Sequence, residues 1–168
     1  MPLHFLGLPG LGGCPQGHWL LHWSHRYGLT PVVQHDWHRP LRGDWMIQLE
    51  EAVLRHEQVV LVADRLATHL VAAWAAHSRQ THRVLAALLV ATPALTAPQD
   101  TVRLPSWQPV LRKVLPFPCL SVAAEPGAPV QDWGARVLAA IGPSPDDADW
   151  EAGWQLLQSQ LQEFIATN

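Results

Sequence analysis

Short apolar runs alternate along this chain with longer segments in which apolar residues recur every three or four positions. The runs are bounded by glycine, proline and polar residues, and they predict strands over 3–8, 30–34, 58–63, 84–91 and 119–124. The periodic segments predict amphipathic helices over 18–27, 44–53, 66–77, 130–141 and 150–165. Strands that alternate with helices indicate an α/β fold with a mostly parallel sheet.

Local signals sharpen several of these boundaries. Gly28 is expected to end the first helix, and Asp44 is expected to cap the start of the second. Segment 58–63 is almost entirely apolar, which is typical of a strand covered by helices on both faces. Residues 93–118 hold many prolines and predict an irregular excursion, and 142–147 reads as a turn-rich linker.

Composition narrows the class of protein. A chain of 168 residues with 48% hydrophobic and 15% charged residues suits one globular domain over 1–168. The net charge of −3, without a basic cluster, argues against a nucleic-acid partner. No apolar run is long enough to span a bilayer, and the first residues do not resemble a signal peptide. We therefore expect a cytoplasmic protein without a membrane segment, with Cys14 and Cys119 as free thiols. Its sequence suggests no cofactor.

An ordered set of short motifs resembles one known family. The motifs are Pro9-Gly10-Leu11-Gly12-Gly13, Gly17-His18-Trp19, Gln34-His35-Asp36-Trp37, Arg39-Pro40, Asp44-Trp45 and Pro116-Phe117-Pro118. In this order and at these spacings they resemble the YdeN-like small serine hydrolases, the family of retinoblastoma-binding protein 9, over roughly residues 3–140. The resemblance implies a flavodoxin-like α/β-hydrolase sheet, here expected to be truncated near the last strand, and a Ser–Asp–His triad.

The chain departs from the family at each triad position. The family serine follows the third strand in a His-Ser-Leu-Gly context, and the matching residues here place Arg65 at the serine position, preceded by Asp64. A guanidinium stays protonated and cannot act as a nucleophile. The family aspartate matches Gly127, with Glu125 two residues away, and no histidine follows His82. We therefore expect a catalytically inactive pseudoenzyme that binds a protein partner or a small acidic ligand.

Two other functions remain open. One is a repurposed esterase that uses Cys14, Glu125 or a histidine in a new geometry, and the other is a structural subunit of a larger complex, with homo-oligomers also open. Arg65 either binds an anion in the former cleft or pairs with Asp64 or Glu125 and fills it. The former oxyanion loop, Gly10-Leu11-Gly12, either presents backbone N–H donors to a ligand or serves only as a tight exit from the first strand.

Histidines and tryptophans supply the last candidates. His18, His22 and His25 share one helix face at spacings of four and three residues, but no Cys, Asp or Glu completes a tetrahedral metal set, so no metal site is predicted. Most of the 9 tryptophans fall on apolar helix stripes and should serve the core. Trp107, Trp133 and Trp150 are instead expected to face a protein partner. Asp64 and His18, like Arg65, are further candidate contacts for a ligand or partner.

Overall fold

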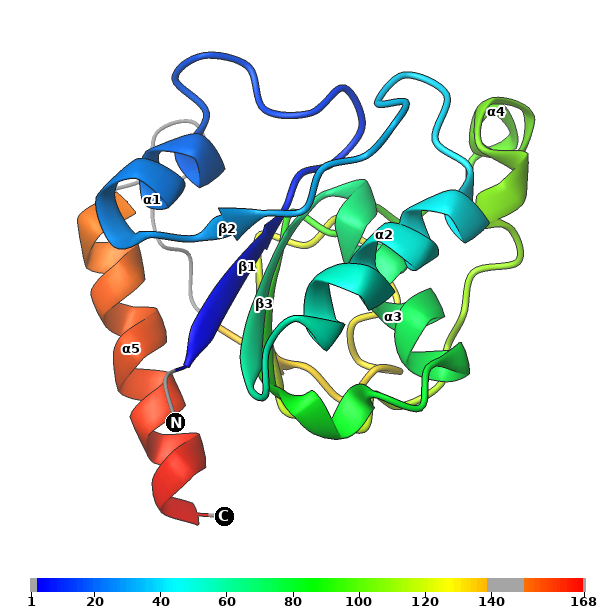
Figure 1. Cartoon of the computed structure of the whole chain (residues 1–168). Coiled ribbons are helices and arrows are strands. Elements are labelled where there is room, and N and C mark those ends of the chain that lie inside the picture. Colours follow the sequence, from blue (N-terminus) through cyan, green and yellow to red (C-terminus); the bar gives the residue numbers. More distant parts are fainter. Residues whose placement is uncertain (1–2, 139–149, 168) are drawn as a thin grey trace.

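Six parallel strands form one sheet through the middle of the molecule (Figure 1). The structure is a computed structural model and describes residues 3–138 and 150–167. The strand order is β2-β1-β3-β4-β5-β6, with bounds His4–Leu8 (β1), Thr30–Pro31 (β2), Val59–Asp64 (β3), Val84–Val90 (β4), Cys119–Val122 (β5) and Arg136–Val137 (β6). The predicted α/β fold with a parallel sheet is confirmed.

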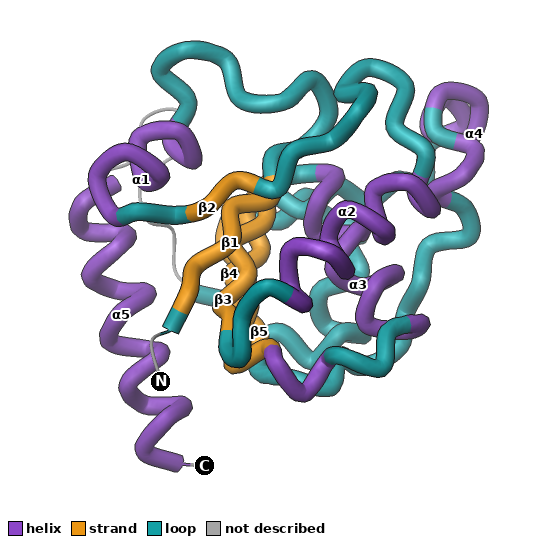
Figure 2. The backbone as a smooth tube through the Cα atoms, in the orientation of Figure 1, coloured by secondary structure: helices purple, strands orange, loops and turns teal. Residues whose placement is uncertain are grey.

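Helices cover both faces of this sheet, so the molecule has three layers. Helices α1 and α5 lie on one face, and α2 and α3 lie on the other (Figures 1 and 2). The bounds are Trp19–Tyr27 (α1), Arg42–Leu54 (α2), Leu66–His77 (α3), Pro98–Arg103 (α4) and Trp150–Thr167 (α5), with single 3₁₀ turns at Thr81–Arg83 and Pro105–Trp107. Within residues 3–138 and 150–167, no helix combines the length and apolarity that a bilayer crossing needs.

The apolar pattern of β3 follows from this layering. All six residues from Val59 to Asp64 are buried, because side chains on both faces of a central strand meet a helix layer. Leu61 and Ala63 belong to the core cluster beneath α2 and α3. Val60 and Val62 belong to the cluster beneath α1 and α5. An ionisable residue at the end of such a strand, Asp64, therefore needs a polar partner inside the fold.

Helix α2 begins earlier than predicted. Its first residue is Arg42 and its N-cap is Leu41, whose side chain makes no capping hydrogen bond. Asp44 therefore lies in the first turn and is not the cap, although its negative charge still suits a helix N-terminus. The Arg42 N–H donates instead to the hydroxyl of Ser106 at 3.0 Å. Ser106, far along the chain, thus accepts the hydrogen bond that the side chain of a local N-cap residue would have accepted.

The helix predicted over 130–141 is wrong for the residues that the structure describes. Val130 and Trp133 are buried at helical spacing, but the chain forms only a tight turn there, because Gly134 adopts a left-handed φ of 79°. The following residues, Arg136–Val137, form the edge strand β6 beside β5. A last strand is therefore present, although it is two residues long. The end of the predicted helix and the linker at 142–147 lie outside the described residues.

Candidate functional site

Arg65 forms a sharp elbow between β3 and α3. Its backbone has φ 52° and ψ −114°, a left-handed conformation that residues with a side chain rarely adopt. The Arg65 N–H donates to the carbonyl of Val90 at 2.8 Å. The Arg65 carbonyl accepts the backbone N–H and the hydroxyl of Thr68, at 3.0 and 2.7 Å. These contacts hold the elbow without any contribution from the side chain at position 65.

The Arg65 side chain projects into solvent. The residue is exposed, and no ion pair or side-chain hydrogen bond joins its guanidinium to any residue within 3–138 or 150–167. The internal pairing with Asp64 or Glu125 that the sequence left open is therefore not formed. Asp64 instead faces His18, and Glu125 Oε2 accepts the backbone N–H of Ala94 at 3.0 Å.

The glycine-rich loop after β1 packs directly against the elbow. A Cβ on Gly10 would lie 2.7 Å from the Asp64 carbonyl oxygen and 3.3 Å from Arg65 Cβ, so only glycine fits at this close approach. The Gly12 N–H donates to the carbonyl of Trp37 at 2.9 Å, and the Gly13 N–H donates to the carbonyl of Gly10 at 3.0 Å. Both donors are already used inside the protein, while Leu11 is exposed. The N–H groups of Gly12 and Gly13 are therefore not available to a ligand in this conformation.

His18 and Asp64 meet beneath this loop. His18 is the N-cap of α1, and its Nδ1 accepts the backbone N–H of Leu20 at 3.1 Å. The ring hydrogen is therefore assigned to Nε2, which lies 3.3 Å from Asp64 Oδ2. Both side chains are buried, with 5% and 2% exposure. His18 and Asp64 were each candidate ligand or partner contacts from the sequence, but their contact with each other was not predicted, although a carboxylate ending an apolar strand was a usable signal.

Opposing effects act on the imidazole of His18. Burial lowers its pKa, whereas the neighbouring Asp64 carboxylate and the Cys14 side chain raise it, and the net pKa is raised to about 9. Protonation would place a hydrogen on Nδ1, and the ring would then lose the capping hydrogen bond from Leu20, a loss of about 1 kcal/mol. Protonation of His18 would therefore replace the helix-capping hydrogen bond with a stronger electrostatic contact to Asp64.

Gly127 is the residue that the sequence resemblance matched to the family aspartate. Gly127 has φ 84° and lies in an exposed turn. Glu125 is also exposed, with its carboxylate turned back to Ala94. Among the residues that the structure describes, no serine hydroxyl is hydrogen-bonded to a histidine.

His69, on α3, is the second buried histidine among the described residues. Its Nε2 lies 2.7 Å from the carbonyl oxygen of Pro93, and its ring packs edge-on against Trp133 with centroids 5.2 Å apart. Burial lowers its pKa to about 4, with Arg112 adding to the effect and the Pro93 hydrogen bond and Glu125 opposing it. The His69 ring is 5% exposed and is held by these two contacts, so its role is in core packing.

Two of the three tryptophans expected at a partner surface are buried. Trp107 is 2% exposed and its indole N–H donates to the carbonyl of Pro40 at 3.1 Å. Trp133 is 1% exposed and its indole N–H donates to the carbonyl of Leu111 at 2.7 Å. The prediction that they face a partner is therefore wrong, since each is a core residue with a satisfied polar tip. The Trp150 side chain lies outside the described residues.

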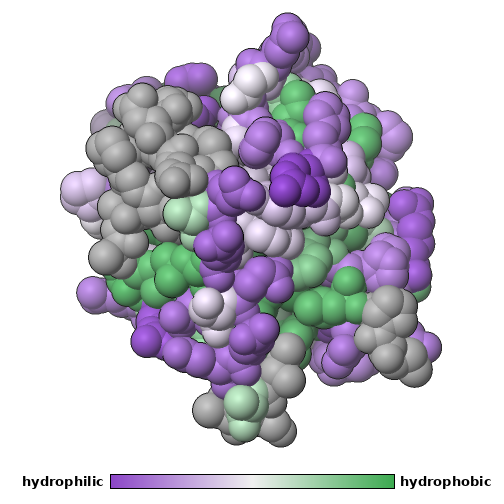
Figure 3. Space-filling model, turned by 90° about the vertical axis from the view of Figure 1, so that its left-hand side faces the viewer, coloured by the Kyte–Doolittle hydropathy of each residue, from purple (hydrophilic) through white to green (hydrophobic). Residues whose placement is uncertain are grey.

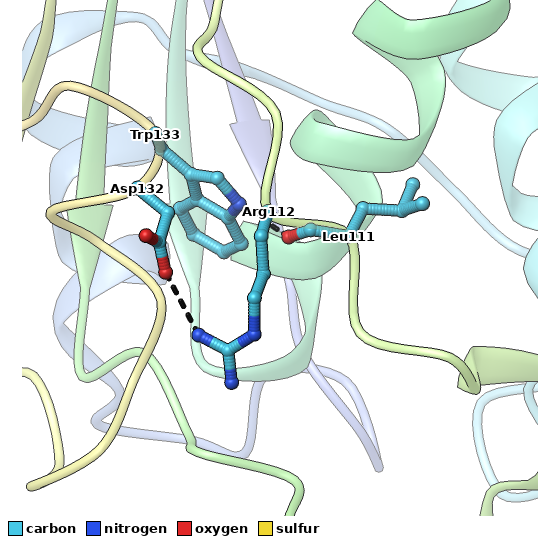
Figure 4. A network of polar contacts seen from close by, with 4 residues as sticks. All are labelled: Leu111, Arg112, Asp132 and Trp133. Atoms are coloured by element: carbon cyan, nitrogen blue, oxygen red, sulfur yellow. Dashed lines mark hydrogen bonds and ion pairs between the residues drawn. The ribbon is translucent and has the colours of Figure 1, made fainter.

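Polar contacts surround Trp133, with an ion pair between the neighbouring Arg112 and Asp132 (Figure 4). Arg112 Nη1 lies 2.8 Å from Asp132 Oδ2. The carbonyl of Leu111, the residue before Arg112, accepts the indole N–H of Trp133. Both charged side chains are about half exposed, at 50% and 47%, so this ion pair adds at most about 1 kcal/mol. Burial of the indole itself is the larger contribution.

The histidines of α1 do not act together. His18 turns inward to Asp64, whereas His22 and His25 are exposed. In the described part of the chain, no three His, Cys, Asp or Glu side chains are arranged to share a metal ion. Figure 3, which views the molecule from the side of α1 and α5, shows hydrophilic side chains interspersed with apolar ones.

A family model described as serine hydrolase matches residues 5–159. The chain therefore belongs to the serine hydrolase family, and the resemblance to YdeN-like hydrolases is confirmed. No curated protein matches the sequence.

Solved structures carry the same fold at low sequence identity. One, named as a YdeN-like hydrolase from Pectobacterium atrosepticum, has a TM-score of 0.79 and 17% identity, covering 96% of this chain and 92% of that one. The ydeN gene product of B. subtilis has a TM-score of 0.65 and 13% identity, covering 98% and 100%. A protein named as an α/β superfamily hydrolase from Xanthomonas campestris has a TM-score of 0.60 and 18% identity, covering 95% and 97%.

Proposed function

We propose that this chain is a serine-hydrolase-family protein without serine catalysis, and that it binds a carboxylate-bearing ligand or protein through Arg65. The observation that carries this proposal is the elbow itself. The strained turn that presents a nucleophile in the family is retained at Arg65, yet the side chain that it presents is an exposed guanidinium with no internal partner in the described structure.

Loss of catalysis follows from chemistry at the elbow, at the position matched to the family aspartate, and in the glycine-rich loop. Arginine cannot form an acyl intermediate, and Gly127 has no side chain to orient a base. The N–H groups of Gly12 and Gly13 are engaged by protein carbonyls, so they do not stabilise an oxyanion in this conformation. Triad members act as a unit, so the loss of several leaves little of the rate enhancement.

A carboxylate is the ligand chemistry that suits Arg65. The guanidinium presents paired N–H donors that match a carboxylate in a bidentate geometry. The elbow also lies beyond the carboxyl end of β3, the edge at which parallel sheets bind their ligands. We further propose a cytoplasmic location, because Cys14 and Cys119 are both unpaired thiols.

Two measurements test this function. A fluorophosphonate probe should label no serine, and p-nitrophenyl butyrate should not be turned over; stoichiometric labelling of one serine would refute the loss of serine catalysis. A thermal-shift titration with citrate as the carboxylate probe should stabilise the wild-type protein and not Arg65→Gln. Arg79→Gln, which removes another exposed arginine without a described partner, is the matched control and should behave as wild type.

The repurposed-hydrolase alternative needs a nucleophile outside the elbow. Glu125 is turned to Ala94, and Cys119 is 3% exposed. Cys14 is half-buried, but no hydrogen bond in the described structure joins its thiol to a histidine.

A further inference from the structure

An open groove lies between α2 and α3, on the face of the sheet opposite α1 and α5 (Figure 1). Its volume is about 220 Å³. Its walls come from the middle of α2 and from the C-terminal end of α3, and they include Met46, Ile47, Glu50, Trp74, His77 and Ser78. The groove therefore combines apolar side chains with one carboxylate, that of Glu50.

Glu50 is held in the groove by neutral donors. Its Oε2 accepts the indole N–H of Trp74 at 3.0 Å and the hydroxyl of Ser78 at 2.8 Å, and its Oε1 lies 2.9 Å from the same hydroxyl. Within residues 3–138 and 150–167, no arginine or lysine forms an ion pair with this carboxylate. A half-buried carboxylate without a cation keeps an uncompensated negative charge, so the groove attracts a positively charged group.

The hydrogen bonds already made by Glu50 indicate which cation fits. A carboxylate offers about four lone-pair positions, two on each oxygen. Both positions on Oε2 are used, whereas Oε1 has one contact and one position left. A guanidinium binds best with one N–H on each oxygen, which this arrangement does not allow. An ammonium group needs only a single acceptor at a time and suits the remaining position on Oε1.

His77 supplies a second acceptor. Its Nδ1 lies 2.8 Å from the carbonyl oxygen of Ala73, and because a carbonyl only accepts, the ring hydrogen is assigned to Nδ1. The Nε2 of the neutral ring is then an acceptor. The Ser78 hydroxyl donates to Glu50 and accepts the N–H of Gln80 at 2.9 Å. An ammonium group carries three donors and no acceptor, so it matches a groove in which Glu50 and His77 both accept.

The rim of the groove extends the same chemistry onto the surface of α2. Ile47 is 57% exposed, and the exposed residues Asp44 and Glu51 lie three positions before it and four after it, on the same helix face. In the described part of the chain neither of these carboxylates pairs with an arginine or lysine. The surface around the groove is therefore apolar and acidic.

Size favours a side chain as the occupant of the groove. A volume of about 220 Å³ is below the range of about 300–1,000 Å³ that is typical of small-molecule pockets. A lysine side chain can lay its methylene stem along apolar walls and place its charged end on a carboxylate. Residues beside that lysine in a polypeptide would contact the exposed part of Ile47, which a free amine in the groove would leave uncovered.

We propose that the α2–α3 groove docks a lysine side chain of a partner protein. Its ammonium group binds Oε1 of Glu50, its stem packs on Met46 and Ile47, and apolar residues flank it in the partner. This site is separate from the elbow, because Arg65 follows β3 and none of the groove residues contacts it. The docking site therefore does not depend on the function proposed for Arg65.

The experiment titrates ¹⁵N-labelled protein with blocked peptides and follows the indole N–H resonance of Trp74, which reports directly on Glu50. The probes are acetyl-Leu-X-Leu-amide, with X as lysine, norleucine or arginine. The lysine peptide should bind about tenfold more tightly than the norleucine peptide, because only its ammonium adds a charge-assisted hydrogen bond. It should also bind more tightly than the arginine peptide. Equal affinity for lysine and norleucine would overturn the proposal, and this comparison needs only wild-type protein.

Matched variants locate the site. Glu50→Gln keeps one side-chain oxygen as an acceptor but removes the charge, and it should weaken the lysine peptide about tenfold while leaving the norleucine peptide unchanged. Glu57→Gln removes an exposed carboxylate beyond the end of α2 and should bind as wild type. Arg65→Gln should also bind the lysine peptide as wild type, so a failure of the carboxylate site and a failure of the groove are distinguishable.

Two further measurements test the commitment to a partner protein. n-Butylammonium has the lysine stem and charge without a peptide backbone, and it should bind more weakly than the lysine peptide; equal binding would assign the groove to a free amine and overturn the proposal. The chain itself has one lysine, Lys113, which is exposed. We expect no change in the Trp74 resonance on dilution of the protein alone. A change that Lys113→Gln removes would place a second copy in the groove and overturn the assignment to another protein.

Discussion

Acidification should destabilise the fold through one buried imidazole, that of His69. Its Nε2 is held 2.7 Å from the Pro93 carbonyl, and burial lowers the pKa of the ring to about 4 in the folded protein. In the unfolded chain the pKa is close to its ordinary value of about 6.5. The unfolded state therefore takes up a proton first as the pH falls, so the stability from neutral His69 is complete above pH 6.5 and is lost between about pH 6.5 and pH 4.

The size of this loss follows from the pKa difference. A shift of about 2.5 units at about 1.4 kcal/mol per unit gives about 3 kcal/mol by pH 4. That is a large part of the 5–15 kcal/mol typical of a folded domain. Arg112 lowers the pKa of the His69 ring and Glu125 raises it, so burial determines the direction of the pKa shift.

Urea unfolding at several pH values measures this loss of unfolding free energy. His69→Gln keeps an amide donor for the Pro93 carbonyl but cannot titrate, so the difference in unfolding free energy between wild type and variant removes the contribution of the carboxylates. Wild type should lose about 3 kcal/mol relative to His69→Gln between pH 7.5 and pH 4. Two curves that stay parallel across that range would show that His69 has the same pKa in the folded and the unfolded protein, and would refute the reasoning.

Four further substitutions test the fold and the elbow. Gly10→Ala should destabilise the protein by about 1–3 kcal/mol in urea unfolding, because its Cβ would meet the Asp64 carbonyl at 2.7 Å. Gly43→Ala, a helical glycine with nothing within 4 Å of an added Cβ, should be neutral or stabilising. Trp133→Ala should cost about 3–5 kcal/mol as a core truncation, and a loss below 1 kcal/mol would restore the partner-surface interpretation. Arg65→Ser should not gain esterase activity, and a gain beyond about tenfold would reveal an unrecognised base.

The elements that sequence predicted best are those in which one physical cause dominates. Segment 58–63 is apolar because both faces of β3 are covered, and the strand was found within one residue at each end. Gly28 ends α1 with φ 76°, as a left-handed glycine cap should. Arg65 could be placed at the elbow because it directly follows this unambiguous strand.

Features that depend on tertiary contacts were not predicted from the sequence. Trp107 and Trp133 lie in segments rich in proline and turns, where no periodicity reports which way a side chain points. Their burial depends on loops folding over the core beneath α2 and α3. The contact between His18 and Asp64 joins residues far apart in sequence, and only the adjacency of β1 and β3 brings them together.

The elbow persists without a nucleophile because the backbone around it does the holding. Arg65 is fixed by its own N–H on Val90 and by Thr68 on its carbonyl, and Gly10 allows β1 to approach closely. None of these contacts depends on the side chain at position 65, so the turn does not require one particular residue there. The side chain at the elbow can therefore vary while the sheet stays the same, whereas the neighbouring Asp64 is tied to the fold through His18.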